Sequence, residues 1–255
     1  GFENMTNKSM PAFALQRKLK RLSLRKTRID SDGLKYLLHL PLEELWLNGT
    51  KIDAKGIAYL TEIPTLKALY LTNTPVDDQG LALIARRMKL TTLGIQGTAV
   101  TTGGIKALAA SPGMAKTLEN LDLSNLDLGN DVFSALKPLR HLKNLDCSKN
   151  PRINGAAIPA LVQLTSVNQL CLGSTNISDR DLPNLVEMQQ LGVIDLSNTK
   201  VTLFGLRHMK KLKHLNTIWL GKLVLSPYEE TLKAEFEKSN PHCTVMLADR
   251  PVFEY

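Results

Sequence analysis

The stretch LKALYLTNTPV, residues 66–76, decides the fold of this chain. The same register occurs upstream as LEELWLNGTKI at residues 42–52 and as LKRLSLRKTRI at residues 19–29. Nine such units follow one another, beginning at Leu19, Leu42, Leu66, Leu90, Leu118, Leu142, Val167, Leu191 and Leu215. Units that return every 23 to 28 residues predict an array of stacked structural repeats rather than one irregular globule.

Each unit contains the signals of one strand and one helix. Leucines alternate with other residues in the first half, which predicts a short strand with its leucines inward and the intervening side chains outward. The second half has apolar residues three apart, which predicts a helical turn. Its expected N-caps are Asp30, Asp53, Asp77, Thr101, Ser178 and Thr202. The predicted fold is an α/β solenoid, a curved horseshoe with parallel strands on the concave face and short helices on the convex face.

These repeats resemble the Thr-bearing leucine-rich repeats common in bacterial proteins, and they are similar to the Cys-bearing type of ubiquitin-ligase substrate adaptors. The resemblance covers residues 19–225. It implies a leucine-rich repeat fold and leaves the partner open, because members of this class share a scaffold and differ in what they bind.

A small polar residue follows each predicted strand at Thr27, Thr50, Thr74, Thr98, Asn150, Thr175 and Thr199. We expect these side chains to be structural and to satisfy backbone groups of the adjacent turn in the stack.

The repeats run without a break, which predicts one domain: an N-terminal flank and cap at residues 1–18, nine repeats at residues 19–225, and a capping helix and strand at residues 226–255. Two units depart from the pattern. The fourth is longer by four residues around Ser111 and Met114, which predicts a bulge on the outer face, and the sixth has one extra residue near Pro151.

Composition narrows the class of protein. No apolar run approaches the roughly 18 residues of a membrane-spanning helix. The N-terminus does not read as a signal peptide, and Gly1 in place of Met suggests an excerpt of a longer or processed protein. Among the three cysteines, Cys147 is expected to point inward and Cys171 outward and exposed, so reduced thiols and a reducing compartment such as the cytoplasm are favoured over a secreted effector.

The net charge of +8 lies mostly at the two ends, with +6 in residues 1–41, −1 in residues 42–199 and +3 in residues 200–255. A solvated cap explains basic ends better than nucleic-acid or anionic-lipid binding, which stays the weakest alternative.

Catalytic patterns are missing from the sequence. The five histidines include no pair at metal-ligand spacing, and there is neither a Cys-x-x-Cys pair nor a phosphate-binding glycine loop. Asp122 and Asp146 on successive strands could imitate a carboxylate pair, but an open surface gives little desolvation for acid/base work. We therefore expect no enzyme activity, cofactor, metal or small-molecule substrate.

The outward column between the inner leucines contains both tryptophans of the chain: Ser23, Trp46, Tyr70, Gly94, Asp122, Asp146, Cys171, Asp195 and Trp219. Trp and Tyr are enriched at binding hot spots. Strand propensity alone could also place aromatic residues there. This alternative is the weaker one for Trp46 and Tyr70 and about equal for Trp219.

The leading hypothesis is a monomeric module that binds a protein or peptide on its concave face. The candidate contact residues are Arg21, Arg25, Trp46, Asn48, Tyr70, Thr72, Asp122, Asp146 and Trp219. Aspartate is also common at these positions of the repeat for structural reasons, and this structural interpretation is preferred for Asp122 and Asp146. A second hypothesis makes the chain the recognition part of a larger enzyme, such as a bacterial kinase or ubiquitin ligase, or a pathogen effector.

Overall fold

The structure is a computed structural model that describes residues 4–250. The chain divides into two compact units, Gly1–Leu126 and Asp127–Tyr255, which we call unit 1 and unit 2 and describe separately.

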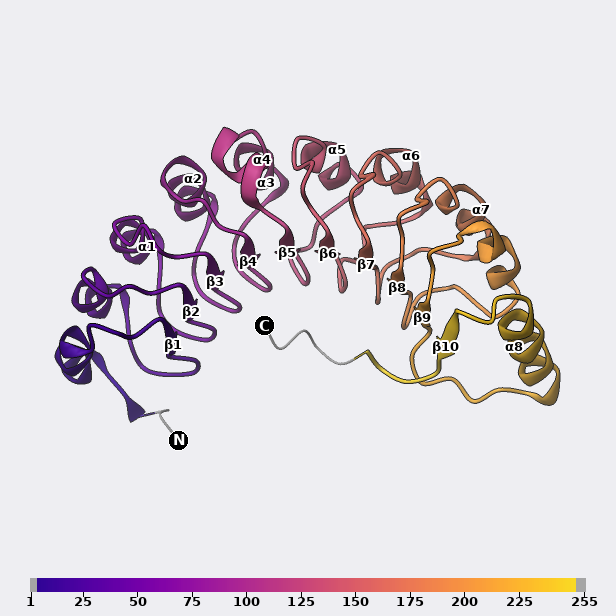
Figure 1. Cartoon of the computed structure of the whole chain (residues 1–255), viewed down its shortest axis with the longest axis horizontal. Helices are drawn as coiled ribbons and strands as arrows, with labels where there is room; N and C mark the ends of the chain where they lie inside the picture. The colour runs from indigo at the N-terminus through magenta and orange to yellow at the C-terminus, as the bar shows by residue number, and fades with distance from the viewer. Residues whose placement is uncertain (1–3, 251–255) are drawn as a thin grey trace. The chain divides into compact units, whose positions relative to one another are not determined.

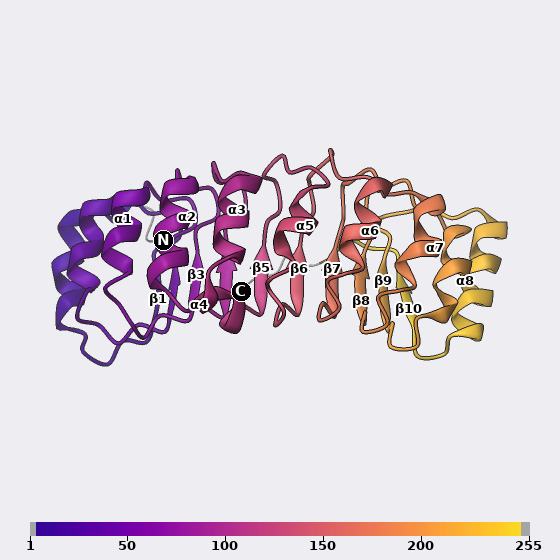
Figure 2. The same ribbon diagram turned by 90° about the horizontal axis from the view of Figure 1, so that it is seen from above.

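Unit 1 contains five parallel strands paired in sequence order. They are β1 (Arg21–Ser23), β2 (Glu44–Trp46), β3 (Ala68–Tyr70), β4 (Thr92–Gly94) and β5 (Asn120–Asp122). Its helices are the 3₁₀ helices η2 (Asn7–Leu15) and η3 (Ser31–Leu37), followed by α1 (Ala54–Leu60), α2 (Asp78–Arg87), α3 (Thr102–Ala109) and α4 (Pro112–Thr117). Within this unit the strands form one layer and the helices the other (Figure 1), and α1, α2 and α3 lie side by side (Figure 2).

Unit 2 repeats this arrangement. Its strands are β6 (Asn144–Asp146), β7 (Gln169–Cys171), β8 (Val193–Asp195), β9 (Thr217–Trp219) and β10 (Thr244–Met246), all parallel. Its helices are α5 (Val132–Leu136), η4 (Gly155–Ala157), α6 (Ile158–Leu161), η5 (Asp179–Asp181), α7 (Leu182–Leu185), η6 (Gly205–Lys211) and α8 (Pro227–Ser239). Each unit is therefore an α/β stack of strand-and-helix repeats, as predicted.

The core lies between the strand layer and the helix layer. Leu45, Leu69 and Leu93 occupy the middle of three successive strands, stand directly opposite one another in register, and are fully buried. Burial of one such side chain contributes about 1.5–3 kcal/mol. Because each leucine packs against those of the neighbouring repeats, the stability of a repeat depends on its neighbours.

The polar residue after each strand closes its own turn. The Oγ1 atom of Thr50 donates to the carbonyl of Leu47 at 2.5 Å, and Thr27, Thr74, Thr98, Thr175 and Thr199 make the equivalent bond to the residue three positions back. The expectation that these threonines bond to the adjacent turn was wrong, because the hydroxyl reaches only its own repeat. Asn150 has the longer side chain and bonds in both directions, to the carbonyl of Cys147 and to the N–H of Leu128 in the preceding repeat.

In each repeat, the residue immediately before the Thr or Asn that follows the strand, or before its equivalent, adopts the left-handed conformation. Gly49, Gly97 and Gly221 occupy it in three repeats, and Lys26, Asn73, Asn125, Lys149, Ser174 and Asn198 occupy it in the others. A positive φ favours Gly and is tolerated by Asn. The turn thus reverses the chain at the same place in every repeat.

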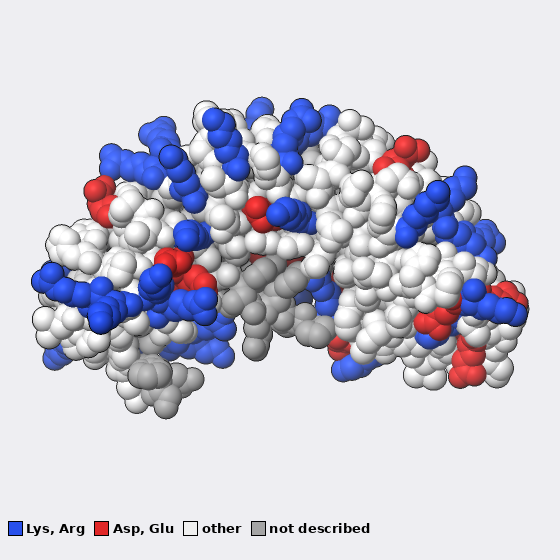
Figure 3. Space-filling model, viewed as in Figure 1, with Lys and Arg blue, Asp and Glu red and all other residues white. Residues whose placement is uncertain are grey.

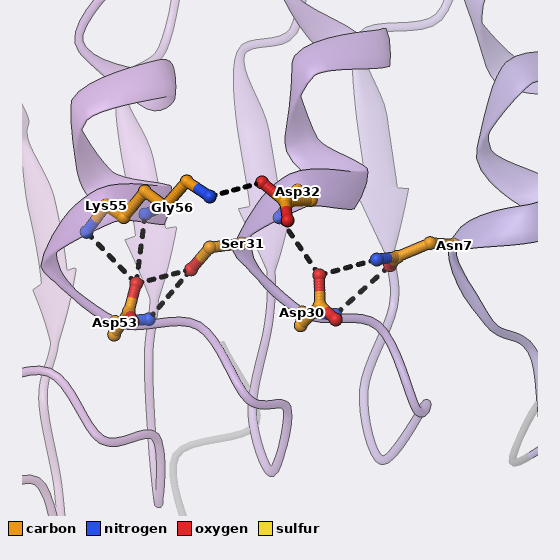
Figure 4. Close-up of polar contacts among 7 residues, drawn as sticks. All are labelled: Asn7, Asp30, Ser31, Asp32, Asp53, Lys55 and Gly56. Atoms are coloured by element: carbon orange, nitrogen blue, oxygen red, sulfur yellow. Dashed lines mark hydrogen bonds and ion pairs between the residues drawn. The ribbon is translucent and has the colours of Figure 1, made fainter.

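Five of the six predicted N-caps are confirmed: Asp30, Asp53, Asp77, Thr101 and Ser178. The prediction for Thr202 was wrong, because η6 begins later and has Phe204 at its N-cap. Some of the caps also bond to the neighbouring repeat, as Figure 4 shows for Asp30 and Asp53. Asp53 accepts hydrogen bonds from the backbone N–H groups of Lys55 and Gly56, which caps α1. The same carboxylate accepts a bond at 2.5 Å from the hydroxyl of Ser31 in the preceding repeat. That hydroxyl bond, the largest cause, and the two backbone bonds lower the pKa of Asp53 against the opposing effect of burial.

Equivalent contacts join Asn7 to Asp30, Asp78 to Thr101 and Asp179 to Thr202. Glycines in several of the helical halves leave room for these side chains. A Cβ on Gly56 would stand 2.7 Å from the Ser31 oxygen, and a Cβ on Gly104 would overlap the Asp78 carboxylate. The repeated glycine therefore serves contact between repeats.

The irregular segments have a clear structural form. The four extra residues of the fourth unit produce α4, an additional helix on the outer side of unit 1. At the C-terminal end, Ser226 begins α8 with a capping box in which its side chain and backbone both bond to Glu229. Strand β10 then pairs with β9.

No helix among residues 4–250 combines the length and apolar character needed to cross a bilayer.

Candidate functional site

A three-layer stack stands on the strand surface of unit 1. The rings of Trp46 and Tyr70 are nearly parallel, with an interplanar angle of 7° and centroids 5.4 Å apart. The guanidinium carbon of Arg25 lies 5.6 Å from the centroid of the Trp46 ring. Because β2 lies between β1 and β3, Arg25 and Tyr70 approach the indole from opposite sides. Ring stacking and cation–π attraction hold the half-buried indole in one orientation.

Tyr70 is the base of this stack. It is only 7% exposed, and burial, followed by the nearby charge of Glu44, raises the pKa of its hydroxyl to about 12 against the opposing charge of Arg25. Its neighbour on β4 is Gly94, where an added Cβ would stand 3.3 Å from the Tyr70 ring. The missing side chain at this position lets the ring lie over the next strand. Tyr70 thus supports Trp46 and presents little surface of its own.

Ion pairs flank the stack at the N-terminal ends of the strands. Arg21 pairs with Glu44 at 3.1 Å, directly across the register of β1 and β2. Glu43 pairs with Lys20 at 2.7 Å and Lys67 at 3.4 Å. The hydrogen bonds and charges of these two lysines lower the pKa of the Glu43 carboxyl. Carboxylates of the second repeat therefore neutralise part of the positive charge that the sequence concentrates in residues 1–41.

Two more predicted contact residues of unit 1 lie just beyond the C-terminal ends of β2 and β3. Asn48 and Thr72 are half-buried and follow the inner leucines of two neighbouring repeats. Their backbone carbonyls accept hydrogen bonds from Lys26 and Gly49, both at 2.8 Å. The side-chain Oδ1 of Asn48 is buried and has no hydrogen-bond donor within the part of the chain that the structure describes.

The carboxylates of the outward column bend back onto their own turns. Asp122 accepts from the N–H and the hydroxyl of Ser124 at 2.9 and 2.7 Å, and Asp146 accepts from the N–H of Ser148 at 2.8 Å. These bonds hold the end of each strand. They support the preferred interpretation of the aspartates as structural residues.

In unit 2 the strand surface is closed where the sequence predicts an exposed thiol. Cys171 is only 1% exposed, so the expectation that it is accessible was wrong. It lies in register between Asp146 and Asp195. Asp195 is itself 7% exposed, and burial, together with the charges of Asp146 and Asp249, raises its pKa against hydrogen bonds from Ser197.

Trp219 lies on β9 of unit 2, where it is half-buried and in register with Asp195 and Met246. All three cysteines are buried free thiols. Within residues 4–250, no group of His, Cys, Asp and Glu side chains is arranged to hold a metal ion.

Parallel pairing brings Trp46 and Tyr70 side by side, but sequence reasoning missed the roles of two residues that hold their neighbours in place. Glu44 holds Arg21, and Gly94 accommodates Tyr70. A signal was present, because Arg21 and Glu44 occupy the same position in successive repeats and must face each other in a parallel register.

The geometry of the repeats can be compared with known proteins. No protein-family model matches the chain, and no curated protein matches it. Among solved structures, an internalin C2 (inlC2) from Listeria monocytogenes aligns with a TM-score of 0.60 and 21% identity over 85% of this chain and 84% of that chain. An internalin (inlF) from the same organism aligns with a TM-score of 0.63 and 19% identity over 95% of this chain and 70% of that chain.

The chain has the leucine-rich repeat fold. At these identities the likeness establishes the architecture. The likeness carries no partner over to this chain, because proteins that share a fold differ in what they bind.

Proposed function

We propose that this chain is a protein-interaction module that binds a protein or peptide on the strand surface of unit 1, with Trp46 as its principal contact. The observation that carries the proposal is the stack of Arg25, Trp46 and Tyr70. A tryptophan fixed before binding loses little conformational entropy when a partner arrives, and rigid aromatic anchors dominate the energy of many interfaces.

The surroundings of the stack favour a polypeptide partner. Asn48 contributes a buried acceptor that lacks a donor among the described residues, and a backbone N–H of a partner would satisfy it. Thr72 adds a second polar group beside the rings, and the pair of Arg21 and Glu44 borders them with both charges. An aromatic centre with a polar rim is the common anatomy of protein interfaces.

Catalysis is not part of the proposal. The carboxylates of Asp122 and Asp146 are engaged in turns, and the thiol of Cys171 is covered. The chemistry that this surface offers is recognition.

The test compares two tryptophan variants that differ only in location. Wild-type protein, Trp46→Ala and Trp219→Ala are immobilised, and the proteins that each captures from cell lysate at matched salt are identified by mass spectrometry. We expect Trp46→Ala to lose partners that Trp219→Ala retains. Loss of the ring pair in Trp46→Ala should cost about 0.5–1.5 kcal/mol beyond the loss of buried area, and thermal unfolding of both variants checks that they stay folded.

Trp46→Phe is the companion variant, because it keeps an aromatic ring against Tyr70 while removing the indole edge. Intermediate capture by this variant is expected. Capture of the same proteins by wild type and Trp46→Ala, at equal thermal stability, would place the binding surface elsewhere.

A further inference from the structure

The helix side of unit 1, which is its outer side, contains a cavity of about 440 Å³. The site proposed above lies on the strand surface and does not use this cavity. It lies between the last turns of α2 and α3 and the beginning of α4, so the four-residue insertion of the fourth repeat forms one of its walls. Small apolar groups contribute much of the lining: Ala82, Ala85, Ala107, Ala110, Pro112 and Gly113. The volume falls in the range of about 300–1,000 Å³ typical of ligand sites.

The walls of the cavity are fixed by the fold. The hydroxyl of Ser111 donates to the carbonyl of Ala85, which ties the start of α4 to α2. The Oγ1 of Thr117 donates to the carbonyl of Leu90 at 2.8 Å, which ties its other end. Between them, Met114 is fully buried. The cavity is therefore already formed in the protein without a ligand.

The border of the cavity is basic. Three cationic side chains line it, those of Arg86, Arg87 and Lys89, and its lining contains no acidic side chain. Arg87 pairs with Glu62 at 3.1 Å, whereas Arg86 and Lys89 are exposed and have no ion-pair partner among residues 4–250. Figure 3 shows Lys and Arg side chains gathered over this outer side.

The helix dipole accounts for only part of this charge. Cations in the last turn of a helix are stabilising, which explains Arg86 and Arg87 at the end of α2. Lys89 follows the helix, and its Cγ would lie 3.7 Å from a Cβ on Gly113. The aliphatic part of Lys89 therefore lines the same space as the alanines, and its ammonium group stands at the rim.

We propose that this cavity binds an acidic peptide segment of a partner protein. An aliphatic side chain of the segment occupies the alanine-lined cavity, and flanking carboxylates pair with Arg86 and Lys89. The charge complementarity selects an acidic ligand. The lining has no aromatic ring on which a nucleic-acid base could stack, which favours a peptide over single-stranded nucleic acid.

The test measures fluorescence anisotropy of a labelled short peptide of alternating Glu and Leu, with a peptide of alternating Gln and Leu as its neutral control. Wild type is compared with Lys89→Glu, which reverses a rim charge, and Gly113→Leu, which fills the cavity. A Cβ on Gly113 meets its nearest atoms at 3.6 and 3.7 Å, an ordinary contact distance, so this variant should fold. Lys106→Glu on α3 is the matched control, because it changes the net charge equally without lining the cavity.

We expect Lys89→Glu and Gly113→Leu each to weaken binding of the Glu–Leu peptide about tenfold, which corresponds to about 1.4 kcal/mol. Lys106→Glu and Trp46→Ala should leave the affinity close to that of wild type. The proposal is overturned if wild type does not bind the Glu–Leu peptide or binds the Gln–Leu peptide equally well. It also fails if Lys106→Glu weakens binding as much as Lys89→Glu, if Gly113→Leu binds normally, or if inorganic phosphate displaces the peptide completely.

Discussion

The carboxylate of Glu237 on α8 accepts a hydrogen bond at 2.9 Å from the backbone N–H of Val245 on β10. The N–H of Thr244 bonds to the carbonyl of Asn216 beside β9, so the N–H of Val245 points to the outer edge of the strand. Lys233 holds both oxygens of Glu237 at 2.8 Å. The terminal helix thus covers a strand edge that would otherwise offer an N–H group to another chain.

Replacing Glu237 should therefore destabilise the end of unit 2 and promote association. Glu237→Ala leaves a backbone donor unpaired, which costs about 1–3 kcal/mol. Glu237→Gln keeps an acceptor for Val245 and should lose less. Chemical denaturation gives the free energy of unfolding, and analytical ultracentrifugation over a range of concentrations reports self-association. Equal stability of the Ala and Gln variants would mean that the hydrogen bond to Val245 does not matter.

The same carboxyl group should make stability depend on pH. Burial alone would raise the pKa of Glu237, but the hydrogen bond and charge of Lys233 and the N–H of Val245 outweigh it and lower the pKa. A lowered carboxyl pKa contributes stability above the unfolded-state value, and the contribution is lost as pH falls through the folded-state value. The stability difference between wild type and Glu237→Gln should shrink in acid. A difference that is constant with pH would contradict this assignment.

The fold could be predicted from the sequence because one recurring pattern marks both the strand and the start of the helix in most repeats. The alternation of leucines gave strands centred on Leu45 and Leu69, and Asp53 was recognised as a cap from its place before an apolar periodicity. Sequence alternation gives the direction of a side chain but not its depth. For that reason the burial of Cys171 between longer neighbours was missed.

The sequence could predict which residues of the candidate site share the outward column, but not how their side chains pack. The sequence placed Trp46 and Tyr70 on neighbouring strands, where parallel pairing brings them side by side. That the rings stack, and that Tyr70 becomes a buried support, depends on side-chain rotamers and on the space above Gly94. Rotamers and free volume are properties of the packed structure, so local patterns do not specify them.

Two helix glycines should respond differently to alanine, because their neighbours in the preceding repeat differ. A Cβ on Gly104 overlaps the carboxylate of Asp78, which bonds to the next cap, so Gly104→Ala should cost about 1–3 kcal/mol. Gly80 faces Ala54, whose Cα would be 3.5 Å away, with a Val76 methyl at 3.0 Å. Here the gain in helix propensity, about 0.5–1 kcal/mol, offsets the tighter contact.

Thermal unfolding of the two variants, both in helices of unit 1, measures this difference directly. We expect Gly80→Ala to stay near wild type and Gly104→Ala to melt earlier. Asp78→Ala combined with Gly104→Ala should remove most of the overlap, so a double variant that recovers no stability relative to Asp78→Ala would argue against the steric cause.

The left-handed turn position gives a prediction in the stabilising direction. Lys149 has a φ of 57°, and the left-handed conformation costs a residue with a side chain about 1–2 kcal/mol, whereas Gly adopts it freely. The greater freedom of Gly in the unfolded chain removes part of this gain, about 0.4–1 kcal/mol. Lys149→Gly should therefore raise the free energy of unfolding modestly while keeping the backbone bond of residue 149 to Gly173.

Gly49→Ala is the reverse experiment at the equivalent position of unit 1. Gly49 has a φ of 70°, and its nearest neighbours, atoms of Lys26, would lie at least 3.6 Å from an added Cβ, so backbone conformation rather than space sets the cost. We expect Gly49→Ala to lower the free energy of unfolding and Lys149→Gly to raise it, both without a change in the denaturant m-value. If both substitutions shift stability in the same direction, turn conformation is not the property that limits these repeats.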